Sequence, residues 1–225
     1  MKLVALEEQR PAFIIRMKGE GAFHPLLLSE LEAALNIVEA ASPPAGLVIT
    51  GEGKFFSTGF DLDAFFKGGS GERESLMHSA VQLLGRLLAF PVPAVAAING
   101  HAFGMGAMAA LACDYRCMRA DRGYFCLPEV DLKVAIPPGM MALLKLKIDH
   151  PALRDLLFTG KRIGADEALR LGIVDEACSL EALLPGAIAR AAALAHKDRE
   201  TYAAMKRGLN QKALSIIECS SKSKA

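Results

Sequence analysis

The stretch Ile98–Arg116, INGHAFGMGAMAALACDYR, predicts how this chain folds around its candidate site. Pro93–Asn99, which overlaps its start, is a short, continuously apolar run of the kind found in buried parallel strands. An Asn-Gly turn follows, and Gly104-Met105-Gly106 begins an apolar helix that we expect to end at Ala112. Glycines at such a turn let a ligand approach the backbone, and a helix N-terminus presents unpaired N–H groups. The stretch therefore predicts a backbone site for a polar ligand atom, such as a thioester oxygen that becomes an enolate.

A second strand-to-helix turn lies earlier in the chain. The apolar run Gly46–Thr50 predicts a buried strand, and GKFFSTGFDLDAFF (53–66) leads from it into a helix that opens near Asp61. Backbone N–H groups at this turn could point into a crevice at the carboxyl end of the strand, or the turn could simply connect two elements. The glycine-rich segment Gly68–Gly71 that follows is either a surface turn or an edge of the binding site.

Strands and helices alternate over the first two thirds of the chain, and helices cluster after Pro138. We expect further strands at Lys2–Leu6, Ala12–Met17, Tyr115–Arg119 and Tyr124–Leu127, and helices at Leu26–Ala41, Glu72–Ala89, Met140–Lys147, Pro151–Phe158, Ala165–Leu171, Leu180–His196 and Arg199–Glu218. This order predicts an α/β chain with parallel strands and a helical C-terminal portion.

Composition excludes several classes of protein. The chain has 225 residues, which suits one domain, and a net charge of +1, which argues against nucleic acid as a partner. The longest apolar run, Leu87–Ile98, is too short to span a membrane and is interrupted by prolines, so we expect a soluble intracellular protein. The five cysteines form no CxxC pair and the histidines are scattered, which predicts reduced thiols and no metal. Cys113, Cys117 and Cys126 are expected to be small buried side chains.

Glu129 is the candidate acid–base residue. It follows Pro128 among apolar neighbours in YFCLPEVDLKVAIPPGM, residues 124–140. A carboxylate in this setting is either at the surface, capping a turn, or buried with a raised pKa, and only the last state suits a general base near neutral pH. Asp131 alternates with it and is expected to face solvent. His101, beside the glycine turn, could contact a ligand or lie at the surface of the turn.

Together these segments resemble the crotonase superfamily, the enoyl-CoA hydratases and isomerases. The match is carried by FFSTGFDL, NGHAFGMGA followed by CDYR, PEV followed by IPPGM, and TGKRIGADEALRLGIVDE, in that family's order and spacing over about residues 5–195. The resemblance implies repeated ββα units, with a crotonase-like core over residues 1–195 and a C-terminal helix and polar tail over 196–225 in the same domain. It also implies a homotrimer or a dimer of trimers.

The same resemblance implies an acyl-CoA thioester as substrate and no cofactor. Hydratases of this family use two glutamates, and this chain has Met108 at the first of those positions and Glu129 at the second. One carboxylate suits a Δ3,Δ2-enoyl-CoA isomerase, which shifts a double bond by moving a proton within the substrate. The other roles carried over are the oxyanion-hole N–H groups of Phe60 and Met105 and substrate contacts at Thr58, Leu62, Gly104 and Met108.

Two alternatives remain at this point. One is another single-base reaction on an acyl-CoA, such as decarboxylation, dehydration or thioester hydrolysis. The other is a non-catalytic scaffold with the same fold. The stretches MRADRGYFCLPEVDL and RETYAAMKRGLNQKAL resemble the plant and peroxisomal isomerases, whereas the final Ser-Lys-Ala is a poor match to the Ser-Lys-Leu peroxisomal address and is expected to lie in a frayed tail. The compartment expected is therefore the cytoplasm or the peroxisome.

Overall fold

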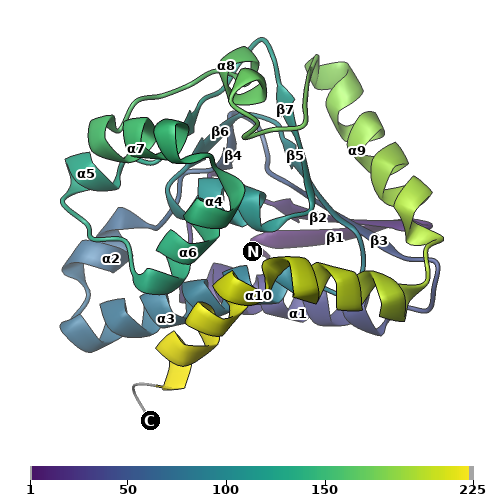
Figure 1. The fold of residues 1–225 in the computed structure, drawn as a ribbon, viewed down its shortest axis with the longest axis horizontal. Coiled ribbons are helices and arrows are strands. Elements are labelled where there is room, and N and C mark those ends of the chain that lie inside the picture. The colour runs from purple at the N-terminus through teal and green to yellow at the C-terminus, as the bar shows by residue number, and fades with distance from the viewer. Residues whose placement is uncertain (1, 223–225) are drawn as a thin grey trace.

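Two β-sheets organise the molecule in a computed structural model that describes residues 2–222 (Figure 1). The larger sheet has the strand order β1-β2-β3-β5-β7-β9, and the smaller has the order β4-β6-β8. Strand β1 pairs with β2 antiparallel, and every other named pair is parallel. The strands are β1 (Val4–Gln9), β2 (Ala12–Met17), β3 (Gly46–Thr50), β4 (Phe55–Ser57), β5 (Ala94–Ile98), β6 (His101–Phe103), β7 (Tyr115–Arg119), β8 (Phe125–Cys126) and β9 (Glu176–Cys178). The predicted α/β class is confirmed.

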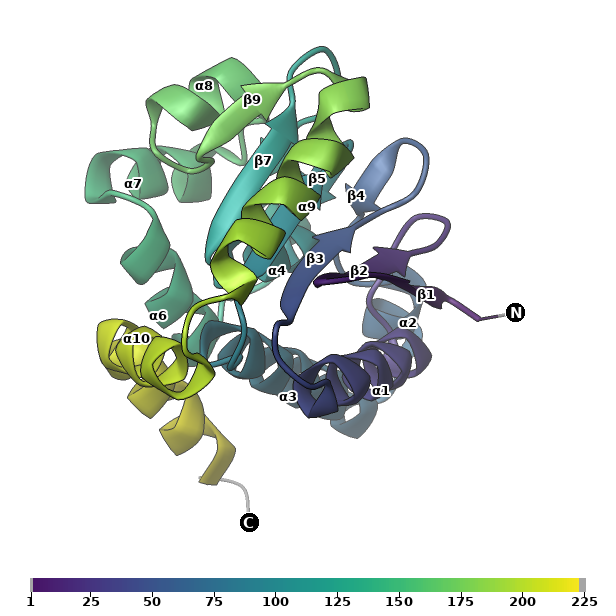
Figure 2. The same ribbon diagram turned by 90° about the vertical axis from the view of Figure 1, so that its right-hand side faces the viewer.

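Helices cover both faces of the six-stranded sheet, which explains why its central strands are continuously apolar. Figure 2 shows α9 lying across one face, where it contacts β3, β5 and β7. Because strand side chains alternate, Val48, Val95 and Ala97 face α9, while Leu47 and Ile49 face the main core on the other side. The helices are α1 (Pro25–Ala40), α2 (Leu62–Lys67), α3 (Ser70–Leu88), α4 (Met105–Ala112), α5 (Glu129–Leu132), α6 (Pro138–Lys147), α7 (His150–Thr159), α8 (Ala165–Arg170), α9 (Leu180–Ala195) and α10 (Arg199–Lys222).

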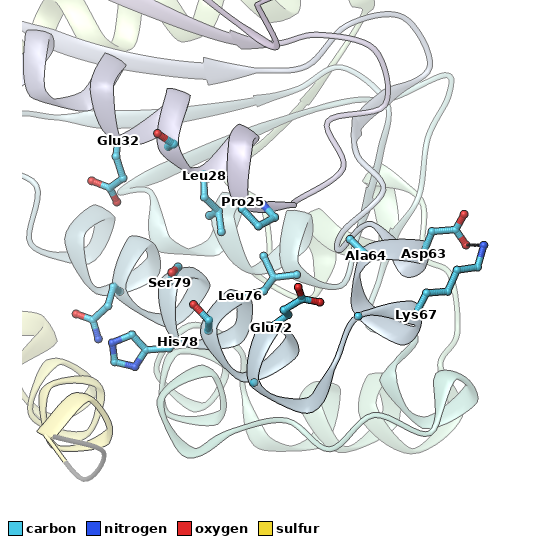
Figure 3. Close-up of a pocket in the computed structure, with 15 residues that line it drawn as sticks. Pro25, Leu28, Glu32, Asp63, Ala64, Lys67, Glu72, Leu76, His78 and Ser79 are labelled. Atoms are coloured by element: carbon cyan, nitrogen blue, oxygen red, sulfur yellow. Dashed lines mark ion pairs between the residues drawn. The ribbon is translucent and has the colours of Figure 1, made fainter.

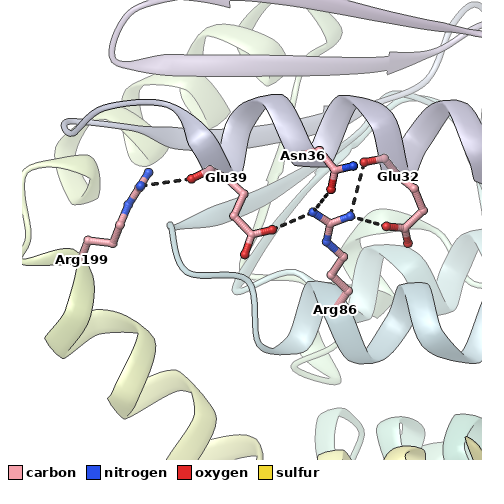
Figure 4. Close-up of polar contacts among 5 residues, drawn as sticks. All are labelled: Glu32, Asn36, Glu39, Arg86 and Arg199. Carbon is pink, nitrogen blue, oxygen red and sulfur yellow. Dashed lines mark hydrogen bonds and ion pairs between the residues drawn. The ribbon is translucent and has the colours of Figure 1, made fainter.

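A polar network joins three helices that are far apart in the sequence (Figure 4). The guanidinium of Arg86 in α3 donates to Asn36 Oδ1 and Glu39 Oε2 of α1, both at 2.7 Å, and also contacts Glu32. Arg199, at the start of α10, donates to the backbone oxygen of Glu39 at 3.2 Å. The network fixes α1 against α3 and places the beginning of α10 beside them, while α10 itself packs on α3 and α6.

Several short elements differ from the sequence-based expectations. Strands β4 and β6 occupy segments that we interpreted as turns, and α5 was not expected at all. The two strands pair with each other in parallel, so their existence depends on a tertiary contact that leaves no local pattern. The sequence also predicts a short extended piece at Ile173–Val174, and the structure places strand β9 just after it. Strand β1 runs to Gln9 rather than ending at Leu6.

The C-terminal helix is longer than expected, because α10 continues to Lys222. The final Ser-Lys-Ala, predicted to lie in a frayed tail, falls outside the described residues. Within residues 2–222, no helix is long and apolar enough to cross a membrane. The expected burial of Cys113, Cys117 and Cys126 is confirmed, and all three are free thiols.

Candidate active site

A cavity of about 260 Å³, which we call the Glu129 cavity, opens where α2, α3, α4, α5 and α6 meet. Its wall is almost entirely apolar. The structure brings all the candidate site residues together on this one wall, although they come from three separate segments: Thr58, Phe60, Leu62, Gly104, Met105, Met108 and Glu129.

Two glycines allow the Phe60 and Met105 segments to approach each other. Gly59 has a φ of +89°, and a Cβ on it would lie 2.8 Å from the carbonyl oxygen of Phe103 and 3.5 Å from the amide nitrogen of Met105. Gly104 has a φ of +49°, which L side chains rarely adopt. Any larger residue at position 59 would push the two backbone segments apart, so the glycine is needed to keep both amides at one cavity.

The amides of Phe60 and Met105 are both available to a ligand. Phe23 N donates to the oxygen of Gly59 at 2.7 Å, and Asp61 N donates to the oxygen of Phe23 at 3.0 Å. The N–H of Phe60, which lies between them, takes part in neither of these hydrogen bonds. Met105 is the first residue of α4, so its N–H has no acceptor within the helix. Neither N–H is bonded to another group in the described part of the chain, and both can donate to an oxyanion.

Glu129 begins the short helix α5, and its carboxyl group lies beside the Gly104 turn. A Cβ on Gly104 would be 3.2 Å from Glu129 Oε1, while Oε2 is buried and has no hydrogen-bond partner among residues 2–222. Burial raises the pKa of Glu129 to about 7, against a smaller opposing effect of its own backbone N–H. A carboxyl group with this pKa is partly ionised at neutral pH and can both accept and return a proton.

Met108 lies one turn after Met105 in α4, with both side chains fully buried. Of the described residues that line the cavity, Glu129 is the one with a carboxyl group. At the position where the sequence resemblance implies a second glutamate for hydration, the cavity therefore presents a thioether. The arrangement supplies one acid–base group and two amide donors.

Two other residues considered in the sequence analysis do not line the cavity, and one residue that does line it was missed. His101 is held among the rings of Phe55, Phe103 and Tyr124, with centroids 5.2–5.5 Å apart, and it does not line the Glu129 cavity. Asp131 is exposed, as expected. Sequence reasoning missed Arg162, which lines the cavity and lies within TGKRIGADEAL, a stretch that we used only as a family signature.

A hollow larger than the Glu129 cavity lies elsewhere, in a groove between α1, α2 and α3 (Figure 3). The groove has a volume of about 980 Å³, and Gly68 and Gly71 are among its lining residues. Its acidic groups already have partners: Asp63 pairs with Lys67 at 3.0 Å, and Glu72 accepts from the N–H of Gly69 at 3.0 Å. The glycine-rich segment therefore leads into α3 at this groove and does not line the Glu129 cavity.

The described residues contain no group of three or more His, Cys, Asp or Glu side chains that could hold a metal ion. A metal site within residues 2–222 thus has no side-chain cluster to support it.

A layered α/β fold, two free amides at a glycine turn and one buried carboxyl group define a crotonase-type protein, and comparison with known proteins agrees. The family model described as enoyl-CoA hydratase/isomerase matches residues 14–220, and the chain belongs to that family. It is 36% identical over 219 residues to enoyl-CoA delta isomerase 3 of Arabidopsis thaliana, covering 92% of each chain. It is 35% identical over 228 residues to the plant's enoyl-CoA delta isomerase 2, peroxisomal, covering 96% of this chain and 95% of the relative.

Solved structures confirm the fold. The crystal structure of a probable enoyl-CoA hydratase from Mycobacterium tuberculosis superposes with a TM-score of 0.91 at 28% sequence identity. The match covers 96% of this chain and 92% of that one. The predicted crotonase fold, with two sheets and a C-terminal helix, is confirmed over nearly the whole chain.

Proposed function

We propose that the protein is a Δ3,Δ2-enoyl-CoA isomerase that converts a 3-enoyl-CoA into the trans-2-enoyl-CoA. The observation that carries the proposal is the pairing of one buried carboxyl group, Glu129, with an apolar residue, Met108, where hydration would need a second acid–base group. The two plant relatives reported above are named as enoyl-CoA delta isomerases, which supports the same choice.

The proposed reaction moves one proton within the substrate. The ionised carboxylate of Glu129 removes a proton from C2, and the electron pair left behind forms an enolate on the thioester oxygen. The amides of Phe60 and Met105 donate to that oxygen and stabilise its charge. The protonated Glu129 then returns the proton to C4 as the double bond moves to C2–C3, so the enzyme ends the cycle in the state in which it began.

The apolar cavity favours this reaction over addition of water. Hydration needs one group to activate water and another to control the proton at the α-carbon, and the thioether of Met108 can do neither. Removing solvent from the site also keeps the pKa of Glu129 near neutrality, which the proton transfer requires. Decarboxylation, dehydration and thioester hydrolysis could use the same single carboxylate, and the assay below separates them.

The other parts of the proposal rest on the family. Thr58 and Leu62 at one side of the cavity are proposed to contact the CoA portion of the substrate, and Gly104 and Met108 its acyl part. We propose a homotrimer or a dimer of trimers, and the large apolar side chains exposed on α10, Met205 and Leu209, suit a helix that is covered in an assembly. The proposed compartment is the cytoplasm or the peroxisome, and a relative is named peroxisomal.

The test is to incubate the protein with trans-3-hexenoyl-CoA and to follow the absorbance of the conjugated 2-enoyl thioester. Glu129→Gln removes the base while keeping the shape of the side chain, and we expect kcat to fall by about 10³-fold. Asp131→Asn is the matched control, because Asp131 belongs to the same short helix but is exposed, and it should keep nearly full activity.

Three results would contradict the proposal. Undiminished activity of Glu129→Gln would remove the base from the mechanism. Formation of a 3-hydroxyacyl-CoA from a 2-enoyl-CoA would show that Met108 does not prevent hydration. Failure of the wild-type protein to shift the double bond, together with release of CO2 or free CoA from another acyl thioester, would replace isomerisation by one of the other single-base reactions.

A further inference from the structure

Arg162 is the one cation among the described residues that line the Glu129 cavity. Its backbone is held in place, because the next residue, Ile163, exchanges two hydrogen bonds with Phe125 at the start of β8, at 2.9 and 3.0 Å. This bridge holds the loop after α7 against the edge of the small sheet, and Arg162 therefore lies beside the cavity.

The side chain of Arg162 is oriented by an aromatic ring. Its guanidinium carbon lies 5.4 Å from the centroid of the Phe103 ring, within the range of a cation–π contact, and Phe103 itself lines the cavity. The adjacent Lys161 behaves differently, since its ammonium pairs with Asp155 at 2.7 Å and Glu167 at 3.2 Å. In the described part of the chain, no carboxylate pairs with Arg162, so its charge is available at the rim of the cavity.

A second cation, Arg122, lies near enough that its charge and that of Arg162 both act on His101. His101 packs on Phe103 with centroids 5.2 Å apart, and its pKa is lowered by burial and by the charges of Arg162 and Arg122. The carboxyl group of the cavity, Glu129, does not pair with Arg162 in the described part of the chain. The rim therefore carries an exposed guanidinium held against a ring beside a largely apolar cavity, a combination that suits an anion delivered by the ligand.

We propose that Arg162 binds an anionic oxygen group of the substrate at the rim of the Glu129 cavity. The inference rests on the proposed function for its substrate class, an acyl-CoA thioester. Phosphate groups in the CoA portion and a carboxylate on an acyl chain share the geometry that a guanidinium recognises with two parallel hydrogen bonds. Arg162 is thus a binding residue, separate from the proton transfer at Glu129.

The experiment measures binding of unreactive ligands by titration calorimetry. Hexanoyl-CoA carries the phosphates, hexanoyl-pantetheine carries no anion, and adipoyl-pantetheine carries only a distal carboxylate. The variants are Arg162→Met, which removes the charge, and Arg162→Lys, which keeps it. Arg170→Met is the matched control, because Arg170 is exposed on α8 and lines none of the cavities described above.

We expect Arg162→Met to weaken binding of at least one anionic ligand by about tenfold, as for a charge-assisted hydrogen bond at an exposed site. Weakening of hexanoyl-CoA alone assigns the contact to a phosphate, and weakening of adipoyl-pantetheine relative to hexanoyl-pantetheine assigns it to an acyl carboxylate. Arg162→Lys should recover part of the affinity, and Arg170→Met should bind like wild type.

Two results would overturn the inference. Equal weakening of all three ligands would show that Arg162 only supports Phe103, and unchanged binding of all three would show that it contacts no ligand. Because none of these ligands can be isomerised, the outcome is independent of the reaction. A protein that fails the hexenoyl-CoA assay but loses hexanoyl-CoA affinity in Arg162→Met would contradict the proposed function and leave the inference standing.

Discussion

Two carboxyl groups withdrawn from solvent, Glu129 and Asp114, lie in opposite surroundings. Glu129 has a buried oxygen without any partner within residues 2–222. Asp114, which directly precedes β7, accepts hydrogen bonds on Oδ2 from the N–H of Ala94 at 2.8 Å, the hydroxyl of Tyr202 at 3.1 Å and the ammonium of Lys206 at 3.0 Å. The same functional group is therefore left unsatisfied at one site and fully satisfied at the other.

The difference shows that hydrogen-bond and ion-pair partners decide whether a buried carboxyl group supports the fold or is available for chemistry. Asp114 and Lys206 form an ion pair whose side chains are only 13% and 4% exposed, and the pair ties α10 to the start of β5 and β7. Both charges are compensated where they are buried, so the pair serves to hold the fold together. Glu129 has no such compensation, and burial raises its pKa, which suits the proton transfer that we propose for it.

The largest expected effect in this comparison comes from breaking the satisfied site. Asp114→Asn leaves the ammonium of Lys206 buried without its counter-charge, and we expect the free energy of unfolding to fall by about 3–5 kcal/mol. Urea unfolding measures the change. Asp121→Asn, which removes the pair that an exposed carboxylate forms with Arg119, should leave the free energy of unfolding nearly unchanged and serves as the control.

Activity completes that test. Asp114 lies at the amino ends of the strands, away from the Glu129 cavity, so isomerase activity per folded molecule should stay close to wild type in Asp114→Asn. A stability equal to that of wild type would mean that the buried ion pair contributes nothing and would undo the contrast between the two carboxyl groups.

Replacing Glu129 is expected to raise the free energy of unfolding, whereas replacing Asp114 lowers it. The pKa of the Glu129 carboxyl group is about 7 in the folded chain and near 4.5 in the unfolded chain. The free energy of unfolding is therefore highest below pH 4.5, where the group is neutral in both states, and falls as the pH rises to 7. Glu129→Gln stays neutral and should be more stable than wild type at pH 8, by about 3 kcal/mol.

Thermal and urea unfolding at pH 4.5 and pH 8 check this prediction. The difference between Glu129→Gln and wild type should nearly vanish at the lower pH, where both side chains are neutral. A variant that is less stable than wild type at pH 8 would show that the ionised carboxylate has a stabilising partner.

The smallest effect is expected from Tyr202→Phe. This change removes one neutral donor from Asp114 and leaves the N–H of Ala94 and the ammonium of Lys206 in place, so the cost should be about 1 kcal/mol. Urea unfolding again gives the measurement. A loss as large as that of Asp114→Asn would mean that the hydroxyl, and not the ion pair, holds α10 to the sheet.

The parts of the site that could be predicted from the sequence are those built by local structure. A buried strand, a glycine turn and an apolar helix follow one another between Pro93 and Ala112, so free N–H groups at the start of that helix could be predicted from the local pattern, and the family resemblance then pointed to Met105. Glu129 could be named for a similar reason, although its raised pKa depends on walls that come from other segments.

Of the small sheet, only β8 was predicted, within the expected strand Tyr124–Leu127. Strands β4 and β6 and the position of Arg162 could not be predicted because they depend on contacts between distant segments: each of the two strands has three residues and pairs in parallel with a strand from another part of the chain. Arg162 reaches the cavity through the bridge between Ile163 and Phe125, residues that are far apart in the chain. The local sequence around Arg162 does not indicate that its side chain packs against the ring of Phe103.

The proposed oxyanion donors at Phe60 and Met105 belong to the main chain, and this has a consequence for how the protein can change. Point mutation replaces side chains and leaves peptide amides in place. The two proposed hydrogen-bond donors to a thioester oxygen are therefore kept as long as Gly59 and Gly104 are kept. Under the proposed mechanism, the choice of reaction depends on replaceable side chains such as Met108. Evolution or an engineer can therefore alter the chemistry in single steps without first losing the ability to stabilise an enolate.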